Sequence, residues 1–145
     1  FVRNESDCRY IFIFEMINKT SLKLLNSITD KPWGRFYDLA ENKKEWHLKI
    51  LVVKKGQRLS LQRHTRRSEF WIVAEGRVQV QKGSKVCILV TQKSIMIGKK
   101  EIHRIKGLTD AVVIELSFGL HKETDIVRLE DDYGRVKQVI KKQKP

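Results

Sequence analysis

The sequence predicts an all-β domain. From about residue 35 onward the chain consists of short runs rich in valine, isoleucine and aromatic residues, separated by Gly, Lys or Asp. Closely spaced runs with turn residues between them are typical of the strands of a sandwich or a barrel. No helical segments separate these runs, which argues against a parallel sheet joined by helices. The length of 145 residues fits one domain with one substantial core.

A short helix is predicted ahead of the strands, because apolar residues between Met16 and Ile28 recur close to helical spacing. Residues 1–30 then form an N-terminal extension with this helix, residues 31–135 form the domain, and residues 136–145 form a basic tail. Residues 136–142 are expected to be a last helical turn or a frayed end. The predicted strands are 35–39, 46–54, 59–64, 70–74, 77–81, 86–90, 94–97, 103–105 and 111–118. Within the run 86–90, Cys87 is expected to be a small buried side chain.

The chain is strongly basic, with 30 Lys and Arg against 17 Asp and Glu and a net charge of +13. A positive field of this kind attracts anions. The basic residues are scattered through every segment, whereas a nucleic-acid reader usually concentrates them on one helix or sheet face. We therefore expect a phosphorylated ligand and no nucleic acid.

Two further features of the composition concern the compartment. No window approaches the roughly 18 consecutive apolar residues of a membrane span, so no membrane partner is expected. Cys8 and Cys87 lie far apart, and a secreted disulfide scaffold would normally carry more cysteines. A cytoplasmic location is the simpler prediction.

The run from Arg58 to His64 has one polar and one apolar face, because side chains two apart on a strand point the same way. Arg58, Ser60, Gln62 and His64 share the polar face. For this strand alone, a solvent-facing surface is the simpler explanation. The alternative is a binding site.

Two later residues favour a site. Glu69 begins an otherwise apolar run, where a carboxylate needs a cation or several hydrogen-bond donors. His103 opens a later strand after a Gly-Lys-Lys turn. Together with Gln62 and His64, they make the ligand set of an open catalytic divalent-metal site.

These residues resemble a known family. The run that begins at Gly56 is similar to the first cupin motif, with Gln62 in place of the motif's first His. Five residues separate Gly56 from Gln62-x-His64, four separate His64 from Glu69, and six separate Glu69 from Gly76. His103 stands where the second cupin motif has its histidine. The resemblance implies a cupin double-stranded β-helix, or jelly roll. More closely, the chain resembles the type II mannose-6-phosphate isomerase domain, which also forms the C-terminal part of bifunctional mannose-1-phosphate guanylyltransferases. The motifs that carry this resemblance are Lys31-Pro32-Trp33-Gly34, the run 56–62, the run 67–71, Asp125-Ile126-Val127-Arg128 and the run 130–135.

The chain departs from the family pattern beside the ligands. The family usually has a His-rich run between the Gln and the Glu and a His before the Trp, where this chain has Arg63-His64-Thr65-Arg66-Arg67 and Phe70. The four ligand positions themselves are kept.

The resemblance implies interconversion of mannose 6-phosphate and fructose 6-phosphate through an enediol. It implies that Gln62, His64, Glu69 and His103 hold a divalent metal, by family Zn²⁺, although the ligand set also suits Mn²⁺, Fe²⁺ or Co²⁺. Arg58, Lys31 and Arg135 are the candidates for binding the substrate phosphate, and surface charge is the alternative for each. The catalytic candidates are Arg58 and Glu115, which lies mid-strand where burial would raise its pKa. A structural role for Glu115 is an equal alternative.

Two other functions remain open, a cupin that binds a sugar or nucleotide sugar, and a metal-binding module without catalysis. Jelly-roll cupins often pair through their sheets, so a homodimer is expected.

Overall fold

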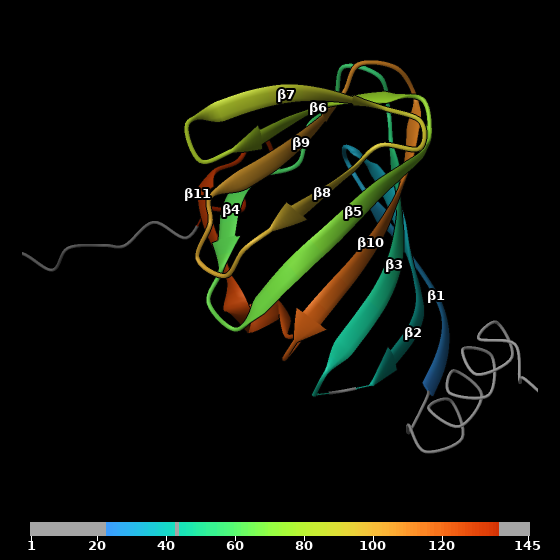
Figure 1. The fold of residues 1–145 in the computed structure, drawn as a ribbon, viewed down its shortest axis with the longest axis vertical. Coiled ribbons are helices and arrows are strands. Elements are labelled where there is room, and N and C mark those ends of the chain that lie inside the picture. The colour runs from blue at the N-terminus through green and yellow to red at the C-terminus, as the bar shows by residue number, and fades with distance from the viewer. Residues whose placement is uncertain (1–22, 43, 137–145) are drawn as a thin grey trace, which may run out of the picture.

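Two antiparallel sheets face each other and enclose the core of the domain (Figure 1). The structure is a computed structural model and describes residues 23–42 and 44–136. Within these residues, one sheet has six strands in the order β1-β2-β3-β10-β5-β8, and the other has five in the order β11-β4-β9-β6-β7. The predicted all-β class is confirmed.

All nine predicted strands are present, with shifts at their ends. The six-stranded sheet contains β1 (Lys23–Lys31), β2 (Gly34–Asn42), β3 (Trp46–Val53), β5 (Arg67–Glu75), β8 (Ser94–Ile97) and β10 (Ala111–Gly119). The five-stranded sheet contains β4 (Leu61–His64), β6 (Arg77–Lys82), β7 (Lys85–Val90), β9 (His103–Gly107) and β11 (Ile126–Glu130), and a 3-10 turn (Glu123–Asp125) precedes β11.

Two strands were not predicted, and the first overturns part of the predicted helix. Residues 16–22 of the helix predicted over residues 16–28 lie outside the described residues. Over residues 23–28 the predicted helix is wrong, because Lys23–Lys31 forms strand β1. This strand pairs with β2 from Lys31↔Gly34 back to Lys23↔Glu41, so its backbone hydrogen bonds go to a neighbour in the sheet. Ile28, one of the apolar residues on which the helix was predicted, is 59% exposed. The other unpredicted strand, β11, pairs with β4. The basic tail lies outside the described residues from residue 137 on.

The inner face of the six-stranded sheet changes character along its length. On β3, His47, Lys49, Leu51 and Val53 all point inward and are buried. On β10 the apolar Ala111 and Val113 are likewise followed by the polar Glu115 and Ser117. On β5 the order is reversed, with the polar residues first and the apolar residues after them. Because β10 lies antiparallel between β3 and β5, the apolar ends of the three strands coincide and so do the polar ends. One half of the interior is therefore a hydrophobic core and the other half a polar chamber. The core cluster consists of Trp33, Leu51, Val53, Trp71, Val73, Val78, Val80, Ile97, Ile105, Ala111 and Val113.

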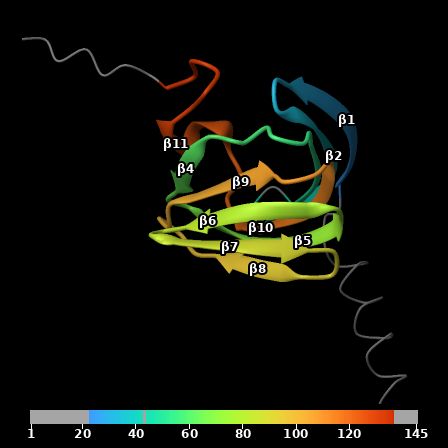
Figure 2. The same ribbon diagram turned by 90° about the horizontal axis from the view of Figure 1, so that it is seen from above.

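One side of the molecule carries the last strand of each sheet. β7 and β8 are the end strands of their sheets and lie on the same side (Figure 2). Val86, Ile88 and Val90 on β7 are 58%, 63% and 40% exposed. Cys87 is also exposed, so the prediction of a buried Cys87 is wrong. The apolar sequence of β7 suits a core strand, but in the structure most of its side chains are exposed. Among the described residues, no helix is long and apolar enough to cross a membrane.

Candidate metal centre

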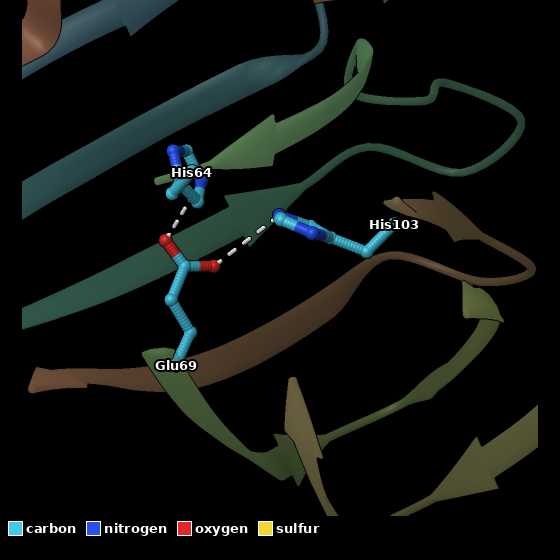
Figure 3. Close-up of side chains that lie close together, drawn as sticks. All are labelled: His64, Glu69 and His103. Atoms are coloured by element: carbon cyan, nitrogen blue, oxygen red, sulfur yellow. Dashed lines mark ion pairs between the residues drawn. The ribbon is translucent and has the colours of Figure 1, made fainter. Parts of the chain in front are cut away.

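Three of the four ligands predicted from the sequence meet inside the polar chamber (Figure 3). His64 ends β4, His103 begins β9 and Glu69 lies on β5, so the two sheets contribute the two histidines and the carboxylate. One ligand atom from each lies within 4.8 Å of the others, and each residue is 1% exposed. The polar face of residues 58–64 is thus directed inward at His64, and the solvent-facing alternative does not hold there.

Glu69 lies at the centre of the group. Its Oε1 is 3.0 Å from His64 Nε2, and its Oε2 is 3.5 Å from His103 Nε2. Arg67, two residues earlier on the same face of β5, donates from Nε to the same Oε1 at 2.9 Å. The Nη2 of Arg67 is 3.2 Å from His64 Nε2. A buried cation therefore contacts both a carboxylate and an imidazole of the group.

The carboxylate is held in its ionised form. Burial alone would raise the pKa of Glu69, but the hydrogen bond and charge of His64, with the charges of His103 and Arg67, hold this pKa below its ordinary value. An ionised carboxylate is the form that binds a metal cation.

His103 has the right tautomer for a ligand. Its Nδ1 lies 2.8 Å from the backbone carbonyl oxygen of Glu101, so Nδ1 carries the proton that is donated there. The lone pair of Nε2 is then directed at the group. Burial lowers the pKa of His103, which favours the neutral imidazole despite the nearby charge of Glu69.

Gln62, the fourth predicted ligand, stands next to these three residues. It is paired in register with His103, and its Nε2 lies 3.3 Å from His64 Nε2. Its Oε1 accepts a hydrogen bond from Ser60 Oγ at 2.7 Å. A half-turn of the amide directs the oxygen to the group and leaves the amide nitrogen beside the Ser60 hydroxyl, which can also accept. Gln62 can then act as the fourth ligand.

The arrangement fits a divalent metal. Glu69 Oε2 and His103 Nε2 are buried and have no hydrogen-bond partner among the described residues. Unpaired buried acceptors of this kind are costly unless a cation or donor lies between them. Two imidazoles, a carboxylate and an amide oxygen suit Zn²⁺, Mn²⁺, Fe²⁺ or Co²⁺.

A cavity of about 530 Å³, including its open mouth, leads to this group. Glu69, Gln62 and Arg67 form part of its lining. Around them, five of the lining side chains are Lys or Arg and two are Glu, so the cations exceed the carboxylates by three. The basic members are Lys31, Lys49, Arg67, Arg128 and Arg135, and the acidic members are Glu69 and Glu115. An anion is the ligand that such a lining favours.

The remaining predicted site residues differ in where they lie. Lys31, Arg135 and Glu115 line the cavity, although Arg135 is bound by Asp131 at 2.6 Å. Arg58 is not part of the lining described here, and its guanidinium makes two hydrogen bonds with Asp132, at 2.6 and 2.7 Å. A catalytic or phosphate-binding role for Arg58 stays a prediction that requires this ion pair to open.

Three basic residues of the cavity were not proposed as site residues from the sequence: Lys49, Arg67 and Arg128. Arg128 is paired in register with Gln62, and its buried Nε has no hydrogen-bond partner among the described residues. Its place in the Asp125–Arg128 motif was a signal that could have found it. For Lys49 the signal was strand parity, because it shares a face with the core residues Leu51 and Val53.

Comparison with known proteins gives one family and many related sequences. Residues 18–131 match the family described as mannose-6-phosphate isomerase C-terminal. The chain is 40% identical over 108 residues to the xanthan biosynthesis protein XanB of Xanthomonas campestris pv. campestris, covering 72% of this chain and 23% of that protein. It is also 40% identical over 108 residues to the alginate biosynthesis protein AlgA of Pseudomonas aeruginosa, covering 72% of this chain and 22% of that protein. The mannose-1-phosphate guanylyltransferase RfbM of Salmonella typhimurium is 32% identical over 111 residues, covering 74% of this chain and 23% of that protein. The chain thus spans less than a quarter of the length of these relatives.

Solved structures support the fold. An RmlC-like cupin from Shewanella frigidimarina superposes with a TM-score of 0.61 at 21% identity, covering 68% of this chain and 87% of that one. The structure of KdgF from Halomonas sp. gives a TM-score of 0.62 at 15% identity, covering 68% and 96%. The predicted cupin jelly roll is confirmed.

The geometry predicts that His103 is needed to hold a metal. We expect the chain to bind one Zn²⁺, and His103→Ala to weaken this binding by about 100-fold or more, because it removes one of the four ligands that the site offers. The readouts are elemental analysis after dialysis and the rise in melting temperature on adding Zn²⁺, since a ligand at about 100 times its Kd stabilises by about 2.7 kcal/mol.

The matched control is His121→Ala, which removes a histidine outside the group and should leave the zinc-induced shift intact. The assignment is wrong if the wild-type chain, purified without chelator, binds neither Zn²⁺ nor Mn²⁺, or if His103→Ala binds them as tightly.

Proposed function

The chain belongs to the mannose-6-phosphate isomerase C-terminal family, and from this premise we propose that it interconverts mannose 6-phosphate and fructose 6-phosphate with a divalent metal. The observation that carries the proposal is a buried His64, Glu69 and His103 group at the end of a cavity with an excess of cationic side chains. That pairing matches the two needs of the reaction, a metal for the sugar oxygens and positive charge for the phosphate.

Gln62, His64, Glu69 and His103 would hold the metal, with Zn²⁺ the first choice by family. When bound, it supplies Lewis-acid chemistry, polarising the sugar oxygens and stabilising the charge of an enediolate. Arg67 fixes Glu69 through its hydrogen bond to Oε1, so that Oε2 is left to face the site.

Glu115 is the proposed base. It lies on the inner face of β10, lines the cavity and makes no ion pair with a described residue within 4.0 Å. Burial, reinforced by the negative charge of Glu69, raises the pKa of the Glu115 carboxyl to about 7, although Lys49 and Arg67 oppose this rise. A carboxylate with such a pKa can take a proton from carbon and return it near neutral pH.

Lys31 and Arg128 are the cations best placed to receive the phosphate, with Arg135 beside them. Arg135 is already paired with Asp131, and Lys49 lies 3.7 Å from Asp38. Lys31 and Arg128 line the same cavity and form no ion pair with a described residue. A dianion entering the cavity gives their charges a partner and supplies Arg128 Nε with an acceptor.

A second candidate function is the binding of a sugar or nucleotide sugar without turnover. Such a protein would use the same cavity and would show ligand-induced stabilisation but no product.

We also propose that the chain is cytoplasmic, because its proposed substrates are phosphorylated sugars.

Isomerisation is tested directly with mannose 6-phosphate. We expect the chain loaded with Zn²⁺ or Mn²⁺ to form fructose 6-phosphate, and Gln62→Ala combined with His64→Ala to abolish this, because two of the four ligands are removed. The measurement is a coupled assay of fructose 6-phosphate, and Arg63→Ala, an exposed position between the two ligands, should keep full activity. No turnover with any divalent metal, in a chain that binds metal stoichiometrically, would favour the non-catalytic function.

Phosphate binding is tested by Arg128→Gln. A charge-assisted hydrogen bond contributes about 1.5–3 kcal/mol, so we expect the Kd for mannose 6-phosphate to rise about tenfold or more. Calorimetry on the metal-loaded chain measures it, with unphosphorylated mannose as the second ligand and the exposed Arg77→Gln as the control variant. An equal loss of affinity for mannose would show that Arg128 does not bind the phosphate.

We also propose a homodimer formed through the end strands β7 and β8. An end strand offers unpaired backbone groups that a second copy can pair with by two-fold symmetry. The exposed Val86, Ile88 and Val90 would be covered in such a pair. The net charge of +13 opposes association of two copies, so this apolar stripe has to supply the attraction.

Light scattering coupled to size-exclusion chromatography tests the dimer. We expect Ile88→Lys to shift the protein to a monomer by placing a charge within the stripe. Ser84→Lys adds the same charge in the neighbouring turn and should leave the dimer intact. A monomeric wild-type chain at tens of micromolar, or a dimer unaffected by Ile88→Lys, contradicts the proposal.

A further inference from the structure

Lys49 is a buried lysine in the cavity, and neither metal binding, phosphate binding nor the proposed base gives it a role. It lies on the inner face of β3, is 7% exposed and belongs to the cavity lining. Lysine is rarely buried to this extent, because its ammonium loses hydration. A lysine kept there needs a specific reason.

The ammonium group is held from one side. Its Nζ lies 3.7 Å from Asp38 Oδ1 and 4.5 Å from the centre of the Phe36 ring. The carboxylate and the face of the aromatic ring both favour a positive charge. These contacts come from β2, so they fix the amine on one flank and leave its other flank to the cavity.

On that other flank stands Glu115. Lys49 on β3 and Glu115 on β10 are direct cross-strand partners, and both side chains point inward. Cβ atoms of such partners are about 5 Å apart. Nevertheless, no ion pair within 4.0 Å joins the two side chains. A carboxyl group and an amine thus stand side by side in the cavity without forming an ion pair.

We propose that Lys49 is the second proton-transferring group of the isomerisation: Glu115 moves a proton between the two carbons, and Lys49 moves a proton between the two oxygens. This inference rests on the proposed isomerase function. It assigns each of the two proton movements in an aldose–ketose conversion to a separate side chain.

The atoms balance over the two half-reactions. In the first, the C2–H bond breaks and the proton goes to the Glu115 carboxylate. The C–H electrons form the C1–C2 double bond, and the carbonyl oxygen on C1 takes a proton from the Lys49 ammonium. In the second, the hydroxyl on C2 returns a proton to the Lys49 amine and becomes the carbonyl, while C1 takes the proton from Glu115. Both side chains end as they began.

The other cations in the cavity are less suited to this role. Arg67 and Arg128 carry guanidinium groups, which do not give up a proton in proteins, and Arg67 is already bound to Glu69. Lys31 lies 5.7 Å from the centre of the same Phe36 ring, but it is not a cross-strand partner of Glu115. Among the described lining residues, Lys49 therefore combines a transferable proton with a place beside the base.

The test compares Lys49→Met, Lys49→Arg and Lys49→Ala in the metal-loaded full chain with mannose 6-phosphate. Loss of a general acid or base costs about 10²–10⁴-fold in rate, so we expect kcat to fall by at least about 100-fold in all three variants while KM changes only a few-fold. Methylammonium should restore part of the kcat of Lys49→Ala, in proportion to its concentration. The matched control is Lys54→Met, an exposed lysine just beyond β3, which should behave as wild type.

Each outcome has one meaning. Near wild-type kcat in Lys49→Arg would show that positive charge alone suffices and would overturn the proton-transfer role. Absence of amine rescue, in a Lys49→Ala chain that keeps its metal content, its circular dichroism and its affinity for mannose 6-phosphate, would overturn it as well. A wild-type chain that fails to convert mannose 6-phosphate refutes the isomerase function itself, and this inference with it.

Discussion

The buried carboxylate of Glu69 is the interaction on which the rest of the structure depends. An ionised carboxylate that is 1% exposed would strongly destabilise the fold if it had no partner. Here the contacts of Glu69 with His64, His103 and Arg67 offset the cost of burying its charge. The two histidines come from one sheet and the carboxylate and arginine from the other. The same contacts that stabilise the charge therefore bring the two sheets together at the polar end of the interior.

This division of the interior into an apolar and a polar half explains where the chemistry can occur. The apolar half, around Val53, Val73 and Val113, supplies the hydrophobic stabilisation of the fold. The polar half on the same three strands contains residues that a stable core alone would not need, including Glu115 and Lys49. Strands anchored by packing at one end hold functional side chains rigidly at the other, as a preorganised site requires.

The sequence predicted the strands well and singled out residues that the fold brings together, because both depend on local patterns. Short runs of β-branched and aromatic residues between turn residues located nine strands, and the spacing from Gly56 to Gly76 singled out Gln62, His64 and Glu69. The predictions from the sequence failed where pairing between distant segments determines the structure. The segment forming β1 has residues that suit a helix equally, and only pairing with β2 makes it a strand. Likewise, spacing could not show that Arg58 is bound by Asp132, or that Arg128 on β11 is paired with Gln62 on the neighbouring strand β4.

The departures from the family pattern can also be placed in the fold. Arg63 precedes His64 on β4, so its exposed side chain points away from the ligand face, and Thr65 is exposed in the turn that follows β4. Arg66 is exposed in the turn before β5, where its backbone N–H is bound by Asp125. Phe70 follows Glu69 on β5 and so points to the opposite face of the sheet. Arg67 contacts Glu69 and His64 within the group, whereas Arg63, Thr65, Arg66 and Phe70 lie beside or behind the metal centre. Because the ligand positions depend on strand parity and on the pairing of the two sheets, replacing the neighbouring histidines alters the surroundings of the site and leaves its ligand geometry in place.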